Sequence, residues 1–162
     1  MYAKNSPAAL LTILSDCEVM LTRIFEARPE LVFKAHTDPD LIPQWWGLRG
    51  NTTVVEKMDV RPGGTWRFIQ LDAEGDEFAF NGEYREVVPS QRLVNTFEFE
   101  GVPGHIILDT VVFEELPDGM TKLTATSLFE TVEERDGMLN SGMEDGSNES
   151  WDRLAELLAG LS

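Results

Sequence analysis

Residues 65–99 read TWRFIQLDAEGDEFAFNGEYREVVPSQRLVNTFEF, and this stretch decides the fold. Large apolar side chains alternate with polar ones, which is typical of β-strands with one buried face. Turn-forming residues interrupt the alternation at 72–75 and at Pro89-Ser90. The stretch therefore predicts three antiparallel strands that share an aromatic face. The residues expected on that face are Trp66, Phe68, Gln70, Phe78, Phe80, Gly82, Tyr84, Leu93, Asn95, Phe97 and Phe99.

The strand pattern continues on both sides of this stretch. Residues 52–60, 105–115 and 121–129 complete a set of six strands with short connections, which indicates an antiparallel meander. Residues 17–27 predict a further strand upstream. Two short helices follow it, one opening at Pro29 and the other at Asp38 as N-cap, with Gly47 ending the second.

Residues 132–161 change to helical spacing and predict one long C-terminal helix. Its distal half carries a dense apolar stripe, whereas its proximal half has small or flexible side chains. Gly142 and Gly146 are points at which it can bend. The predicted fold is α+β: a helix-grip in which a curved antiparallel sheet of about seven strands wraps around this helix. One helix cannot cover so wide a sheet tightly, so we expect a cavity between them.

Length and composition fit one domain, expected at 16–162 after an N-terminal extension at 1–15. The 162 residues carry 13 basic and 29 acidic side chains, a net charge of −16. This excess of acid excludes a typical nucleic-acid binder and argues against docking on anionic membranes. The lone cysteine, Cys17, and the lack of a long apolar run favour a cytoplasmic protein. Its state as monomer or homodimer stays open.

The acidic residues concentrate at 72–118, which contain twelve acidic and two basic side chains. Most of these acids alternate with apolar residues, as expected for the solvated face of a sheet. The alternative is an acidic surface for a basic partner or cation.

Short motifs follow one another along residues 17–160. They are Arg23-Ile24-Phe25-Glu26-Ala27, Pro29-Glu30-Leu31-Val32-Phe33, Thr37-Asp38-Pro39, Trp45-Trp46-Gly47, Asp59-Val60-Arg61-Pro62-Gly63-Gly64, Trp66-Arg67-Phe68, Gly82-Glu83-Tyr84, Pro89 with Arg92-Leu93, and Gly146 before Arg153-Leu154. In order and spacing they resemble the START-like superfamily (SRPBCC, birch-pollen-allergen-like helix-grip proteins), and within it the homologues of the heat-shock protein 90 ATPase activator. The resemblance implies this fold, a cavity for hydrophobic small molecules and no shared catalytic set. Leu48 and His36 depart from the family pattern. These departures bear on the shape of the pocket mouth and not on the fold.

The candidate ligand-binding residues come from the aromatic face, the proximal part of the helix and the two tryptophans near Gly47. Packing of an ordinary core is the alternative role for the aromatic set, and anchoring of a short helix is the alternative for the tryptophan pair. Methionines suit varied ligands, and the polar members would orient one. The candidates are Trp45, Trp46, Trp66, Phe68, Phe80, Tyr84, Asn95, Phe97, Met138, Met143, Ser147 and Trp151.

Motifs for chemistry are missing from the sequence. The two histidines, His36 and His105, lie far apart and Cys17 has no basic neighbour, so we expect no metal site, no catalytic residue and no cofactor. The leading hypothesis is binding of an apolar or aromatic small molecule. The alternatives are a co-chaperone-like ATPase regulator that binds a protein partner, and a cyclase- or hydrolase-like enzyme. The enzyme would need a buried pocket acid, such as Glu83 or Asp109.

Overall fold

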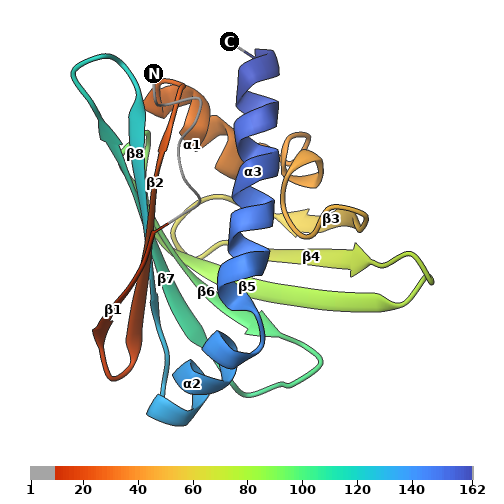
Figure 1. The fold of residues 1–162 in the computed structure, drawn as a ribbon. Coiled ribbons are helices and arrows are strands. Elements are labelled where there is room, and N and C mark those ends of the chain that lie inside the picture. Colours follow the sequence, from red (N-terminus) through yellow and green to blue (C-terminus); the bar gives the residue numbers. More distant parts are fainter. Residues whose placement is uncertain (1–9, 162) are drawn as a thin grey trace.

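The computed structural model describes residues 10–161, and Figure 1 shows their arrangement. The strands are β1 (Leu10–Ser15), β2 (Glu18–Phe25), β3 (Thr52–Met58), β4 (Thr65–Leu71), β5 (Glu77–Val88), β6 (Arg92–Phe99), β7 (Ile107–Glu115) and β8 (Thr121–Leu128). The helices are α1 (Pro29–Thr37), the 3-10 turn η2 (Ile42–Gln44), α2 (Val132–Asn140) and α3 (Met143–Leu161).

The strands form one antiparallel sheet in the order β1-β2-β8-β7-β6-β5-β4-β3. From β3 to β8 each strand pairs with its neighbour in sequence, so the predicted meander is confirmed. β2 joins it through pairing with β8. The sheet curves, and α3 runs across its concave side (Figure 1), which is the α+β architecture expected from the sequence.

The expected N-terminal extension at 1–15 is wrong for its second half, because residues 10–15 form strand β1. This strand pairs with β2 across a tight turn at Asp16-Cys17, with Leu11 opposite Leu21 and Ile13 opposite Val19. The sheet therefore has eight strands instead of seven. Residues 1–9 of the expected extension lie outside the described residues.

The second short helix expected after Asp38 is also largely wrong. The carboxylate of Asp38 accepts a hydrogen bond from the backbone N–H of Asp40 at 2.8 Å, and this bond forms a turn. Only the 3-10 turn η2 follows it. A side-chain oxygen bonded two residues ahead stabilises a turn in place of a helix start. Gly47 ends the segment with φ of +100°, a conformation that favours glycine.

The expected single C-terminal helix is two helices. The break lies at Ser141-Gly142, where Gly142 has φ of +92°, so the helical path cannot continue through it. Thr131 caps α2 by accepting a hydrogen bond from the N–H of Glu134 at 3.1 Å. Gly146, the other expected bending point, lies within the continuous helix α3.

The distal half of α3 is fixed to the sheet, as its apolar stripe predicts. Leu154 is fully buried and Leu158 is nearly so. Trp151 packs edge-on against Phe25 of β2 at 5.8 Å between ring centroids. The guanidinium of Arg23 pairs with Asp152 at 2.7 Å, which ties the same two elements together. The proximal half of α3 contributes no fully buried side chain, and this difference leaves space under it.

Candidate functional site

A cavity of about 670 Å³ lies between the concave face of the sheet and α3. Its walls come from the sheet strands β2 and β4–β8, from α1, from η2 and the following loop, and from the α2–α3 segment. The volume falls within the range of small-molecule binding sites. Leu48 and Phe78 line the cavity and are also exposed, so the cavity opens to solvent beside them.

All twelve candidate residues line this cavity. The strand register therefore places the expected faces inward, with Phe68 opposite Phe80 on β4 and β5. Contact of these residues with a ligand stays a prediction. His36, Asn51, Gln70, Asp109 and Ser127 also line the cavity and were not among the candidates.

The two adjacent tryptophans have different roles. Trp45 is 4% exposed, and its indole N–H donates to the carbonyl of Ala35 at 2.9 Å, so it anchors the η2 segment to α1. Trp46 instead packs edge-on against the cavity aromatics. Its ring centroid lies 5.1 Å from that of Phe68 and 5.4 Å from that of Phe80. Trp46 therefore covers the aromatic wall.

The ring of Trp66 lies over Gly82 on the neighbouring strand. A Cβ at Gly82 would come within 2.5 Å of the indole nitrogen of Trp66 and 1.9 Å of the Thr96 carbonyl oxygen. Only glycine fits under that ring. The buried indole N–H of Trp66 has no hydrogen-bond partner within residues 10–161.

A row of polar side chains crosses the otherwise aromatic and aliphatic wall. Four adjacent strands contribute one residue each, and the pairing places Tyr84 opposite Asn95, Asn95 opposite Asp109, and Asp109 opposite Ser127. All four line the cavity. Directly opposed residues of an antiparallel pair lie on the same face about 5 Å apart, so these four form a continuous polar row.

Asp109 is the member of the row that carries charge. Its Oδ1 accepts a hydrogen bond from the hydroxyl of Ser127 at 2.7 Å. Burial disfavours the charged form and raises the pKa of the Asp109 carboxyl from 3.8 to about 6, although the Ser127 hydrogen bond acts in the opposite direction. The signal for Asp109 is present in the sequence, because it lies in phase with Ile107, Val111 and Phe113 on β7.

Two other titratable side chains line the cavity, and both are uncharged at neutral pH. The ring of His36 packs against Trp45 and Phe113, and its Nδ1–H donates to the carbonyl of Val32 at 2.8 Å. Burial lowers the pKa of His36 to about 4. Burial raises the pKa of the Tyr84 hydroxyl well above its ordinary value.

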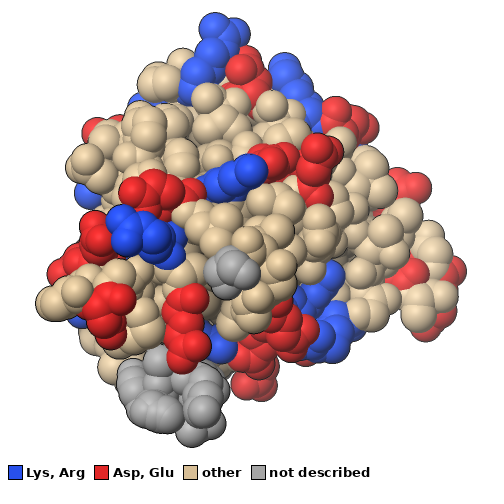
Figure 2. Space-filling model, turned by 90° about the horizontal axis from the view of Figure 1, so that it is seen from above, with Lys and Arg blue, Asp and Glu red and all other residues tan. Residues whose placement is uncertain are grey.

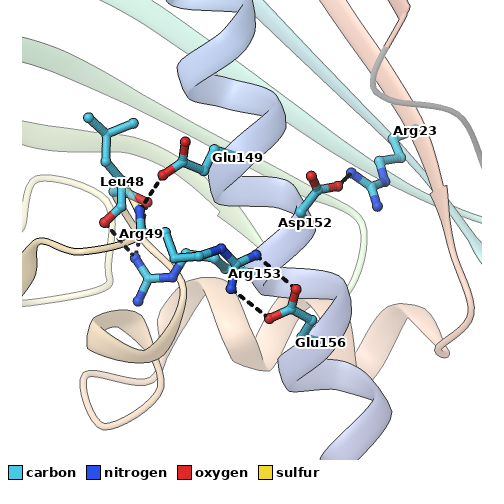
Figure 3. Close-up of polar contacts among 8 residues, drawn as sticks. Arg23, Leu48, Arg49, Glu149, Asp152, Arg153 and Glu156 are labelled. Atoms are coloured by element: carbon cyan, nitrogen blue, oxygen red, sulfur yellow. Dashed lines mark hydrogen bonds and ion pairs between the residues drawn. The ribbon is translucent and has the colours of Figure 1, made fainter.

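The loop after η2 is fastened to α3 by several polar contacts, which Figure 3 shows around Leu48 and Arg49. The guanidinium of Arg153 donates to the carbonyls of Gly47 and Leu48 at 3.0 and 3.2 Å. Arg49 forms a two-pronged pair with Glu156 at 2.8 and 2.9 Å, and its backbone N–H donates to Glu149. These contacts fix the cavity rim.

The remaining candidates for chemistry lie outside the cavity. Glu83 pairs with Arg85 at 3.1 Å, and His105 pairs with Glu134 at 2.9 Å on the surface. Cys17 lies in the turn between β1 and β2. The three acids at 72, 74 and 76 come close together in the β4–β5 turn, where Asp72 accepts backbone hydrogen bonds that stabilise the turn itself.

The family model described as Activator of Hsp90 ATPase homolog 1-like protein matches residues 26–159. No curated protein matches the chain. A crystal structure from Chromobacterium violaceum is similar at 28% identity and a TM-score of 0.79, covering 89% of this chain and 98% of that one. One from Rhodobacter sphaeroides is similar at 25% identity and a TM-score of 0.89, covering 95% and 99%.

A third structure is similar in fold alone. DynU16, a protein from the dynemicin biosynthetic locus, shares 24% identity at a TM-score of 0.69. The match covers 90% of this chain and 48% of DynU16.

Proposed function

The chain belongs to the family of Activator of Hsp90 ATPase homolog 1-like proteins, and from that premise we propose that it binds an apolar or aromatic small molecule between the sheet and α3. The observation that supports this proposal is the cavity of about 670 Å³ with its wall of aromatic and aliphatic side chains. A ligand that covers this wall would gain roughly 25 cal/mol for each Å² of apolar surface removed from water.

The flexible side of the cavity suits ligands of varied shape. Met138 and Met143 line it from α2 and α3, next to the break at Gly142. Unbranched thioether side chains adapt to irregular partners. The sheet side is rigid by comparison, because hydrogen-bonded strands carry its aromatic rings.

Fluorescence provides the test, because all four tryptophans of the chain line the cavity. N-phenyl-1-naphthylamine, an apolar dye, should bind with saturable energy transfer from tryptophan, and native mass spectrometry should show one dye per chain. Ala125→Phe should fill the cavity and weaken dye binding at least about tenfold.

Thr124→Phe is the matched control, since Thr124 precedes Ala125 on β8 and does not line the cavity. It should leave dye binding unchanged. Equal binding by both variants, or no saturable binding by the unaltered protein, would contradict the proposal.

The enzyme alternative keeps one supporting observation, the pocket acid Asp109. Glu83 does not serve, because it pairs with Arg85 and does not line the cavity. A carboxyl whose pKa of about 6 lies near neutrality is suited to proton transfer. To test this, ligands recovered from the purified protein are incubated with the unaltered protein and with Asp109→Asn, and their masses are compared. A mass change that needs Asp109 would favour the enzyme.

The alternative function is a co-chaperone-like regulator that binds a protein partner through an acidic surface. The charge distribution gives this alternative less support. Arginines pair with many of the acids, as in Arg67 with Glu100 and Glu56, and Arg92 with Glu86. Figure 2 shows acidic and basic side chains interspersed on the face seen from above.

Among the described helices, none is long and apolar enough to span a membrane. A cytoplasmic location remains part of our proposal.

A further inference from the structure

The charges that face the cavity are unbalanced. Among the described residues that line it, Asp109 is the one carboxylate, and no lysine or arginine is present. The titratable groups that face it from the other elements are Tyr84 of β5 and His36 of α1, and both are neutral at pH 7. An ionised Asp109 therefore has no cationic partner within the cavity wall.

Among the described residues, the cavity wall holds one fully buried unpaired donor, the indole N–H of Trp66, and three side chains with unused acceptors. Within residues 10–161, Asp109 accepts one hydrogen bond, at Oδ1, which leaves Oδ2 without a partner. His36 donates through Nδ1, which leaves Nε2 as an acceptor. Asn95 uses its amide N–H₂ on the carbonyl of Thr96 at 2.9 Å, and its Oδ1 remains unused. The wall can therefore receive several donors from a ligand, in addition to offering the Trp66 N–H to an acceptor.

We propose that the ligand of this cavity carries a protonated amine on an apolar or aromatic body, and that the amine pairs with Asp109. This proposal rests on the proposed function and adds the class of ligand. A partly buried carboxylate with no cationic partner is costly, and a charge-assisted hydrogen bond from an ammonium group would offset that cost.

Two features besides the carboxylate favour a cation, and the charge state of the carboxylate agrees with them. The rings of Trp46, Trp66 and Phe80 present aromatic faces and edges in the same cavity, and aromatic faces attract cations. The net charge of −16 draws cations toward the protein and repels anions. With a pKa of about 6, the Asp109 carboxyl is mostly ionised at neutral pH before any ligand arrives.

Competition among three matched compounds tests the proposal. They are 1-naphthylmethylamine, 1-naphthalenemethanol and 1-naphthaleneacetate, and each is titrated at pH 7.5 to displace N-phenyl-1-naphthylamine. The amine should compete at least about tenfold more strongly than the alcohol, and the carboxylate should compete most weakly.

Two variants identify the group responsible. Asp109→Asn keeps the shape of the side chain and should bring amine and alcohol to within about twofold of one another. Glu114→Gln removes one negative charge from the exposed face of the same strand and should keep the full preference for the amine. Dye affinity should be similar in all three proteins, which also shows that the variants are folded.

The outcomes separate the two proposals. If the unaltered protein does not bind the dye, the proposed function fails. If the dye binds but the amine competes no better than the alcohol, the ligand class alone is wrong. A preference for the amine that survives in Asp109→Asn would assign it to the overall charge of the protein and would overturn the role of Asp109.

Discussion

Asp109→Asn should make the protein more stable at neutral and alkaline pH. The pKa of the carboxyl rises from 3.8 to about 6 on folding, so the folded state favours the protonated form. Its ionisation therefore costs stability as pH rises from below 4 to above 6. This rise in the pKa corresponds to a loss of stability of about 3 kcal/mol when the group is fully ionised. This figure is an upper bound, because the cavity is open to solvent and because the hydrogen bond from Ser127 is weaker to a neutral asparagine oxygen than to a carboxylate.

The pH dependence isolates this cost from other effects of the substitution. At pH 5 the folded carboxyl is largely protonated and the penalty is partly relieved, whereas at pH 8 it is complete. The advantage of Asp109→Asn over the unaltered protein should therefore grow by about 1–2 kcal/mol between pH 5 and pH 8. His36 titrates in the same range, with a pKa lowered to about 4, but both proteins contain it and it cancels in the difference.

Urea denaturation of both proteins, followed by tryptophan fluorescence at pH 5, 6, 7 and 8, measures this difference. The lowest pH lies above the isoelectric point of about 4.3, which keeps the protein negatively charged. Glu114→Gln, on the exposed face of β7, serves as the control and should track the unaltered protein at every pH. A constant difference between Asp109→Asn and the unaltered protein, or one that shrinks as pH rises, would refute the reasoning.

The other predictions concern packing and the backbone. Leu154→Ala removes a fully buried side chain from α3 and should lower the free energy of unfolding by about 2–5 kcal/mol in urea denaturation, whereas Leu161→Ala, 44% exposed, should change it by less than about 0.5 kcal/mol. Gly82→Ala should prevent stable folding, seen as loss of soluble protein or of a cooperative melting transition, because its Cβ would lie 1.9 Å from the carbonyl oxygen of Thr96; a normal melting temperature would contradict this. Gly137→Ala, in the open middle of α2 with nothing near its Cβ, should raise stability by about 0.5–1 kcal/mol in the same assay, and a loss would show that α2 depends on that glycine.

The strands of the meander and their inward faces could be predicted closely from the sequence. β4 spans Thr65–Leu71, as the alternation around Trp66 and Phe68 indicated. The alternation is a local property, because successive side chains of a strand point to opposite faces. The prediction therefore needed no knowledge of which strands pair.

The errors fell where local signals compete. Residues 10–15 were assigned to an N-terminal extension outside the domain, yet they pair with the edge of β2 and form β1. The helical pattern of 132–161 spans a glycine that adopts a positive φ and divides it. Asp38 satisfies both a helix-start pattern and a turn, and its hydrogen bond to Asp40 selects the turn.

The cavity-lining residues were predictable as a class, including the polar Tyr84, Asn95 and Ser147, whereas Asp109 was expected there only if the protein is an enzyme. Aromatic side chains in alternation mark an inward face whatever their neighbours are. Asp109 instead belongs to a chain segment rich in acids that mostly face solvent, and its composition suggested the outer surface. Its phase with Val111 and Phe113 places it inside.

The sequence by itself determined the strand meander, the aromatic inner face, the apolar stripe of the last helix and the exclusion of a basic binding surface. These follow from periodicity and composition, which act along the chain. Only the tertiary structure decided that β2 pairs with β8, that Tyr84, Asn95, Asp109 and Ser127 form one row, and that a cavity remains above them. Register between distant strands and the pKa of a carboxyl depend on what surrounds each group in space, and that surrounding exists only once the sheet has closed around α3.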